Sequence, residues 1–183
     1  MERIKARSGA IGRLIVTHIG MAVFGLVTFL WTNQLGKGIC LAAGIFSALF
    51  YAAMIYVPMW ELGAKDKAAI DAGRLTKYRG DGFWIAAVAQ IPVFLLTLAY
   101  FICGLLQGTQ LADSIRAVCY AILVLVDGCF TGVMIALAPG GKNYLAVAAV
   151  FFVAVLYVVA VSGVSYLLGT KEMRIVPKKN EKA

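Results

Sequence analysis

Five long apolar stretches, separated by short polar ones, dominate the sequence. They cover residues 14–32, 38–59, 83–106, 115–138 and 144–168. A helix needs about 20 residues to cross the roughly 30 Å hydrocarbon core of a bilayer, so each stretch is long enough to span it. None shows the alternation of polar and apolar residues that membrane β-barrel strands have. We therefore predict an all-α, multi-pass integral membrane protein: one domain, residues 1–183, folded as a compact bundle of about five transmembrane helices.

The composition agrees with this fold class and narrows the chemistry. Of the 183 residues, 62% are hydrophobic and 14% are charged. A small soluble domain has too much surface to cover with so few polar residues. The four cysteines form no C-x-x-C pair, and a single histidine is too few for a multi-histidine site. We expect neither a metal site nor a cofactor.

The net charge of +8 comes from basic residues that flank the apolar stretches. Basic flanks tend to stay on the cytoplasmic side, so those before the first stretch predict a cytoplasmic N-terminus in the plasma membrane. The 60–82 loop then also lies in the cytoplasm. Five spans would, however, leave the basic C-terminal tail, residues 169–183, outside the cell.

An alternative topology removes this conflict. The 115–138 stretch could enter and leave the membrane on the outer side as a re-entrant hairpin broken at Asp127-Gly128, which leaves four spans and a cytoplasmic tail. It places 14 of the 17 basic residues inside, compared with 10 for five spans. We favour five spans, because late charges influence topology less than early ones.

Two ionisable side chains, His18 and Asp127, lie within the predicted spans. Such residues are costly in a membrane and often functional. Asp127 shares a stripe with Arg116, Tyr120 and Thr131, and their spacing places all four within an arc of about 60° on one continuous helix. The stripe could line a path for a small solute or a proton, or it could join helices by hydrogen bonds. We favour packing, which buried polar residues serve as readily as transport.

A direct contact between His18 and Asp127 is not expected. Counted from the predicted inner ends of their helices, they lie roughly 6 Å and 16 Å deep, at about 1.5 Å per residue. Helix tilt or a bridging water would have to close this gap. In the third stretch, Gln90 joins the polar lining, and Pro92 should kink the helix.

The remaining candidates are assigned by residue type. Gly44, Gly128 and Gly132 are assigned to close helix packing, and Trp60, Tyr78 and Trp84 to anchoring in the lipid headgroups. We interpret the charged 60–82 loop as a solvated helical extension of the second span.

No arrangement of nucleophile and base, or of paired carboxylates, occurs at a spacing that catalysis would use, so we do not expect an enzyme. Our first hypothesis is a non-catalytic subunit or accessory protein that assembles with another membrane protein or with itself. The alternative is a small transporter or substrate-binding membrane component that uses the polar residues around Asp127. The expected partners are the lipid bilayer, a membrane protein and a small solute or proton, but not nucleic acid.

Overall fold

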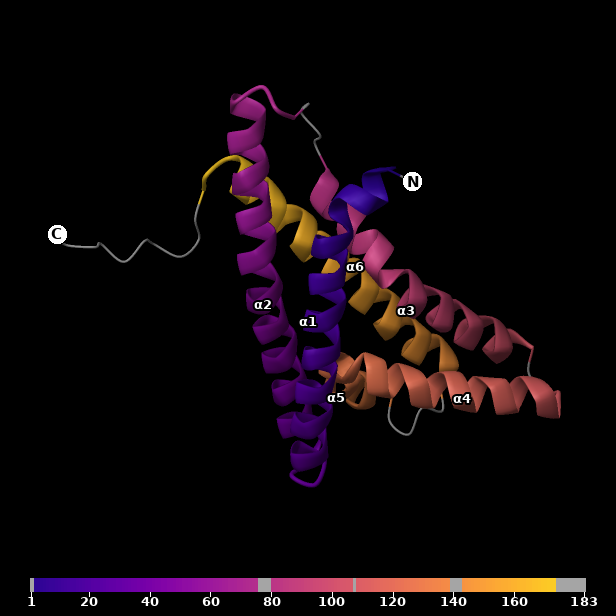
Figure 1. Cartoon of the computed structure of the whole chain (residues 1–183). Helices are drawn as coiled ribbons and strands as arrows, with labels where there is room; N and C mark the ends of the chain where they lie inside the picture. The colour runs from indigo at the N-terminus through magenta and orange to yellow at the C-terminus, as the bar shows by residue number, and fades with distance from the viewer. Residues whose placement is uncertain (1, 76–79, 107, 139–142, 174–183) are drawn as a thin grey trace.

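A computed structural model describes residues 2–75, 80–106, 108–138 and 143–173, and in these ranges the chain forms six α-helices and no strand (Figure 1). The helices are α1 (Glu2–Thr32), α2 (Lys37–Asp71), α3 (Asp81–Leu105), α4 (Gln110–Val126), α5 (Gly128–Leu137) and α6 (Tyr144–Thr170). The predicted all-helical bundle is therefore confirmed. Four of these helices, α1, α2, α3 and α6, are long and apolar enough to cross a membrane.

The helices begin and end where local chemistry favours it. The side chains of Thr109 and Asn143 accept hydrogen bonds from the backbone of Ala112 and Ala146, and so cap the first turns of α4 and α6. Gly36 has a φ of 109° in the turn between α1 and α2, a conformation that favours glycine. The short connections make α1 and α2, α3 and α4, and α5 and α6 antiparallel neighbours, whereas α2 and α3 each pack against α6.

Contacts near one end of the bundle fix the directions of the long helices. Arg7, near the start of α1, donates to Asp66 near the end of α2 and to Asp81 at the start of α3. Tyr166, near the end of α6, also donates to Asp66. The start of α1, the end of α2, the start of α3 and the end of α6 therefore lie together, at what we call the N-terminal end.

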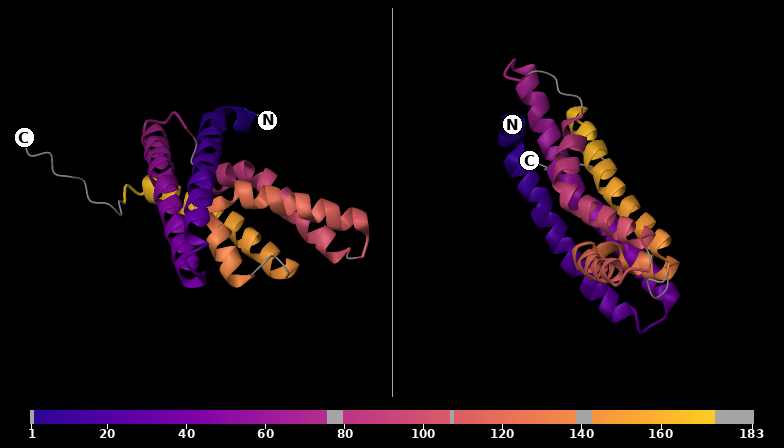
Figure 2. Two further views of the ribbon diagram at one scale, coloured as in Figure 1. Left: turned by 90° about the horizontal axis from the view of Figure 1, so that it is seen from below. Right: turned by 90° about the vertical axis from the view of Figure 1, so that its right-hand side faces the viewer.

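The chain between α3 and α6 leaves and returns at the opposite end, which we call the far end. Gly104, near the end of α3, packs on the ring of Tyr144, the first residue of α6. From the far end α4 runs toward the middle of α1, the chain turns at Asp127, and α5 runs back (Figures 1 and 2). Along α5, Gly128 packs against Ala22 of α1, and Gly132 against Cys40 near the start of α2.

The prediction of one continuous helix over 115–138 is therefore wrong. Asp127 has φ −102° and ψ 35°, outside the helical region, and separates α4 from α5. Aspartate competes for backbone hydrogen bonds, and Gly128 lets the backbone of α5 approach α1 more closely than any Cβ would allow. The resulting hairpin has the geometry of the alternative topology. Four helices run from one end of the bundle to the other, and the segment from α4 to α5 turns back.

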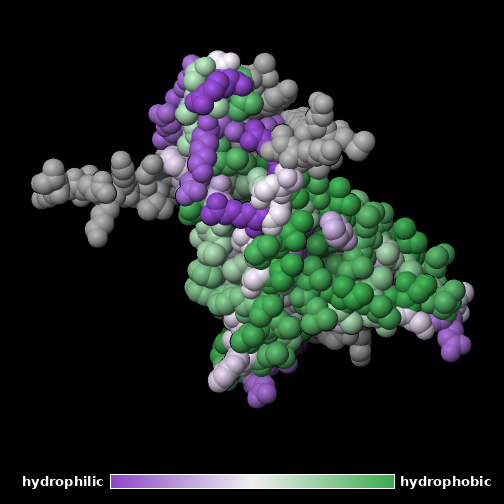
Figure 3. Space-filling view, viewed as in Figure 1, coloured by the Kyte–Doolittle hydropathy of each residue, from purple (hydrophilic) through white to green (hydrophobic). Residues whose placement is uncertain are grey.

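The surface separates into two regions along the bundle. Apolar side chains form a broad continuous area over the middle and far parts, and polar side chains gather around the N-terminal end (Figure 3). Exposed large apolar residues occur on all four long helices and on α4. This distribution is typical of a helical bundle whose middle faces lipid.

Candidate functional site

Four polar side chains meet where α1, α2 and α3 approach the break between α4 and α5. They are His18 of α1, Tyr51 of α2, Gln90 of α3 and Asp127 at the break. We call these four side chains the polar centre. Their exposed fractions are 8%, 1%, 3% and 2%. The centre is therefore closed to the surface and lies among apolar side chains, including Phe130.

His18 connects the members of the polar centre. Its Nδ1 lies 2.8 Å from the Tyr51 hydroxyl and 3.5 Å from the Gln90 amide nitrogen. An amide nitrogen can only donate, so Nδ1 is assigned as the acceptor and the Tyr51 hydroxyl as a donor to it. The neutral imidazole then carries its hydrogen on Nε2, which lies 3.5 Å from Oδ1 of Asp127. The ring thus stands between a phenol and a carboxyl group.

Several polar atoms in and near the centre have no hydrogen-bond partner among the described residues. They are Nε2 of His18, Oε1 of Gln90 and Oδ2 of Asp127, together with the hydroxyl of Ser162 on α6. Buried polar groups without a partner are rare in proteins and destabilising. Three such atoms on adjoining side chains give the centre a capacity for hydrogen bonding that the protein itself does not use.

The helix break positions the carboxyl group of Asp127. The Asp127 N–H still closes the last turn of α4 on Leu123, and its carbonyl accepts from Phe130 at the start of α5. The thiol of Cys129 donates to the Met21 carbonyl, a sulfur–oxygen distance of 2.8 Å, and so ties α5 to α1. Backbone groups at the two helix ends, which cannot all pair within their helices, thus lie beside the polar centre.

The prediction that His18 and Asp127 lie too far apart to pair is wrong. The depth of roughly 16 Å assumes one straight helix whose inner end is Ala138. Because α5 returns to the far end, Ala138 lies at the opposite end of the bundle from the one assumed. The break directs Asp127 toward the middle of α1, where His18 lies.

The predicted stripe does not form a single face, because its helix breaks at Asp127. Thr131 is buried on α5, and its hydroxyl donates to the Val124 carbonyl across the break. Arg116 is partly exposed on α4 and pairs with Asp113 at 3.0 Å. Of the predicted polar lining, the structure brings together His18, Gln90 and Asp127.

Neither Tyr120 nor Pro92 belongs to the polar centre. The Tyr120 ring lies 6.2 Å from that of Tyr100, and its hydroxyl faces the sulfur of Met134. It therefore belongs to the core between α3, α4 and α5. Pro92, two residues from Gln90, lies inside α3, which continues without interruption from Asp81 to Leu105.

The remaining predicted residues are the packing glycines and the aromatic residues that were assigned to the lipid headgroups. Gly44 packs on the backbone of Val133, so that all three predicted packing glycines lie against a neighbouring helix. The Trp60 indole donates to the Met173 carbonyl, 2.7 Å away, and Trp84 is partly exposed. Tyr78 lies outside the described residues.

The sequence did not point to a second polar group, at the N-terminal end. Arg7 donates to Asp66 at 3.0 Å and to Asp81 at 3.0 Å, and the Tyr166 hydroxyl donates to Asp66 at 2.7 Å. We call these four residues the ion cluster. The 60–82 segment was expected to be solvated, but Asp66 and Asp81 are 5% and 2% exposed. No local spacing relates them to Arg7, so pattern analysis could not find this contact.

We predict that His18 and Asp127 are energetically coupled. In His18→Ala the carboxyl group loses its imidazole neighbour, so a following Asp127→Asn change should alter stability less than it does in the wild type. The coupling energy should be about 0.5–3 kcal/mol, as for residues in direct contact. Unfolding of both single variants and the double variant by dodecyl sulfate in mixed micelles measures it, and additive effects would contradict the contact.

Comparisons of the chain with protein-family models, with curated proteins and with solved structures give no match.

Proposed function

We propose that the protein is a small membrane transporter that moves a proton, alone or together with a solute, through the polar centre. The observation that carries this proposal is the buried His18–Asp127 pair at a helix break, with Nε2 and Oδ1 3.5 Å apart. Ionisable residues at such depth typically belong to ion or proton pathways. Broken helices near the middle of the membrane are a common way for transporters to build such sites.

The chemistry of the centre suits a proton. The Asp127 carboxylate can take up and release a proton beside Nε2–H of His18, 3.5 Å away, and the Tyr51 hydroxyl, which donates to Nδ1 at 2.8 Å, keeps the imidazole hydrogen on Nε2. The four side chains of the polar centre are closed off from the surface, with at most 8% of each exposed. In this conformation a proton therefore fits the site better than a larger solute does.

For orientation, we propose the plasma membrane with the N-terminal end in the cytoplasm. The start of α1, the end of α2, the start of α3 and the end of α6 all lie at this end (Figure 1). These helix ends and the segments joined to them in sequence carry most of the basic residues, and such clusters favour the cytoplasmic side.

The subunit role that we predicted first has no observation of its own in its favour. The exposed apolar residues of α4, such as Leu111, Val118 and Leu125, would suit lipid as well as a partner helix. An accessory role therefore stays a prediction.

Proton flux into proteoliposomes tests the transport proposal. A pH-sensitive dye is trapped inside, an inward pH gradient is imposed, and valinomycin with potassium holds the membrane potential at zero. Wild-type protein should collapse the gradient faster than empty liposomes do. Asp127→Asn should return the rate to that of empty liposomes, because an amide cannot accept and release the proton.

Asp113→Asn is the matched control, because it makes the same chemical change in an exposed carboxyl group at the far end. It should retain the wild-type rate. Both variants are compared with wild type for monodispersity and melting temperature before reconstitution. Wild-type flux equal to that of empty liposomes, or wild-type flux in Asp127→Asn, would overturn the proposal.

A further inference from the structure

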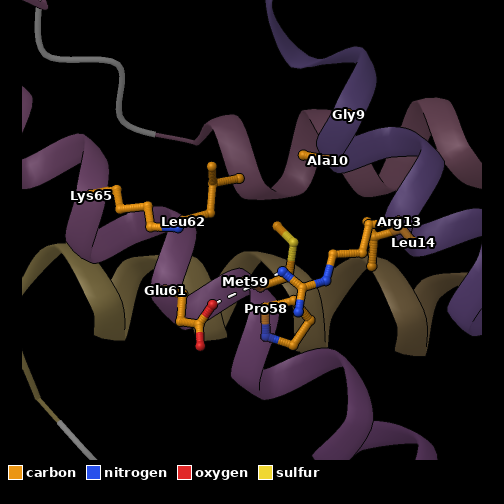
Figure 4. Close-up of a pocket in the computed structure, with 9 residues that line it drawn as sticks. All are labelled: Gly9, Ala10, Arg13, Leu14, Pro58, Met59, Glu61, Leu62 and Lys65. Atoms are coloured by element: carbon orange, nitrogen blue, oxygen red, sulfur yellow. Dashed lines mark ion pairs between the residues drawn. The ribbon is translucent and has the colours of Figure 1, made fainter.

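A groove of about 180 Å³ lies between α1 and α2 at the N-terminal end, away from the polar centre (Figure 4). Its floor is apolar and includes Leu14, Met59 and Leu62. Its rim carries three charged side chains, Arg13 from α1 and Glu61 and Lys65 from α2. The groove therefore combines an apolar base with a net positive rim.

The charges on the rim are weakly engaged with one another. Arg13 reaches toward Glu61 across the groove, with 3.9 Å between nitrogen and oxygen (Figure 4). These side chains are 62% and 46% exposed, and ion pairs of this kind contribute little. Lys65, one turn beyond Glu61, is exposed and gives the rim a second cation. The Arg13 guanidinium can thus exchange Glu61 for a phosphate, which it can bind with two parallel hydrogen bonds.

An apolar surface continues from the groove toward the far end. Helical spacing places Met54 and Phe50 on the face of α2 that carries Pro58 and Glu61, and Phe24 on the face of α1 that carries Arg13. Met54, Phe50 and Phe24 are 47%, 41% and 36% exposed, and the two phenylalanine rings lie 5.3 Å apart. A ligand with a charged head and a long hydrocarbon tail would match this order of surfaces.

We propose that the groove binds an anionic phospholipid, with its phosphate between Arg13 and Lys65 and an acyl chain along the seam between α1 and α2. The charge of the rim selects the class of lipid. A glycerol headgroup leaves the phosphate as a net negative charge, whereas a choline headgroup adds a cation that Arg13 and Lys65 repel. This proposal does not depend on the transport function.

Binding is tested with the full chain in detergent, by native mass spectrometry with added dioleoyl phosphatidylglycerol or dioleoyl phosphatidylcholine. Wild-type protein should bind the glycerol lipid more tightly. Arg13→Gln with Lys65→Gln should weaken that binding about tenfold or more, because two cations near the phosphate are removed. Glu61→Gln should strengthen it, since the carboxylate that competes for Arg13 is gone.

Arg74→Gln with Lys171→Gln is the matched control, because it removes two exposed cations at the same end outside the groove. It should bind phosphatidylglycerol as the wild type does. Equal weakening by both pairs would show a general effect of surface charge and overturn the site. Equal wild-type affinity for the two lipids would overturn the headgroup selectivity. Protection against thermal unfolding by inorganic phosphate alone would show that the groove binds a free anion and not a lipid.

Discussion

Replacing Arg7 with glutamine is expected to lower the free energy of unfolding by about 3–5 kcal/mol, the range observed when one partner of a buried ion pair is removed. The Arg7 guanidinium bonds to two carboxylates at once, and the side chains of Asp66 and Asp81 are 7% and 2% exposed. Glutamine removes the positive charge that both share, so two negative charges remain together in a largely dry site. The cluster joins α1, α2, α3 and α6, and its loss should loosen the whole N-terminal end.

Unfolding by dodecyl sulfate in mixed micelles measures this effect. Arg116→Gln is the control, because it removes an arginine from the pair with Asp113, whose side chains are 31% and 49% exposed. Exposed pairs of this kind contribute less than about 1 kcal/mol. If both arginine variants changed stability by the same small amount, the ion cluster would not hold the helices together.

A reporter that is active only in the cytoplasm, fused after the C-terminal residue Ala183, is expected to be active. The reason is geometric: α6 ends beside α2 at the N-terminal end, where Trp60 donates to the Met173 carbonyl and Lys67 pairs with Glu172 at 2.9 Å. Because α4 and α5 leave and return at the far end, the chain crosses the bundle an even number of times. Both termini should therefore face the same side of the membrane.

Fusions at two other points calibrate this experiment. A reporter placed after Arg74, between α2 and α3, should be active, and one placed after Gly36, between α1 and α2, should be inactive. Five spans predict the opposite result for the fusion at Ala183 and the same results for the other two. An inactive reporter at Ala183, with both calibrating fusions behaving as expected, would contradict the re-entrant hairpin.

Much of the fold followed from local information in the sequence. The lengths of the apolar stretches placed the four long helices, because crossing a bilayer requires a fixed run of apolar residues. The same reasoning singled out His18, Gln90 and Asp127, since polar side chains in such runs are few and cannot face lipid cheaply. These three residues lie together in the structure.

Local information in the sequence does not fix the path of the chain around Asp127. A run of about 24 apolar residues has the same hydropathy whether it crosses the membrane once or turns back at its middle. The choice rests on contacts with other helices, such as that of Gly128 with the Ala22 carbonyl of α1. In the sequence the hairpin is indicated by the basic C-terminal tail and by the Asp127-Gly128 pair, but late charges influence topology less than early ones.

Sequence patterns alone identify the chain as a helical membrane-type bundle and single out the few polar residues that interrupt its apolar segments. Their partners were decided by the tertiary structure. His18 meets Asp127, and Arg7 meets Asp66 and Asp81, across long separations in sequence. Helical periodicity relates residues three or four positions apart, whereas these contacts depend on how helices cross and where one of them breaks. The turn at Asp127 thus brings a buried carboxyl group to the one histidine of the chain.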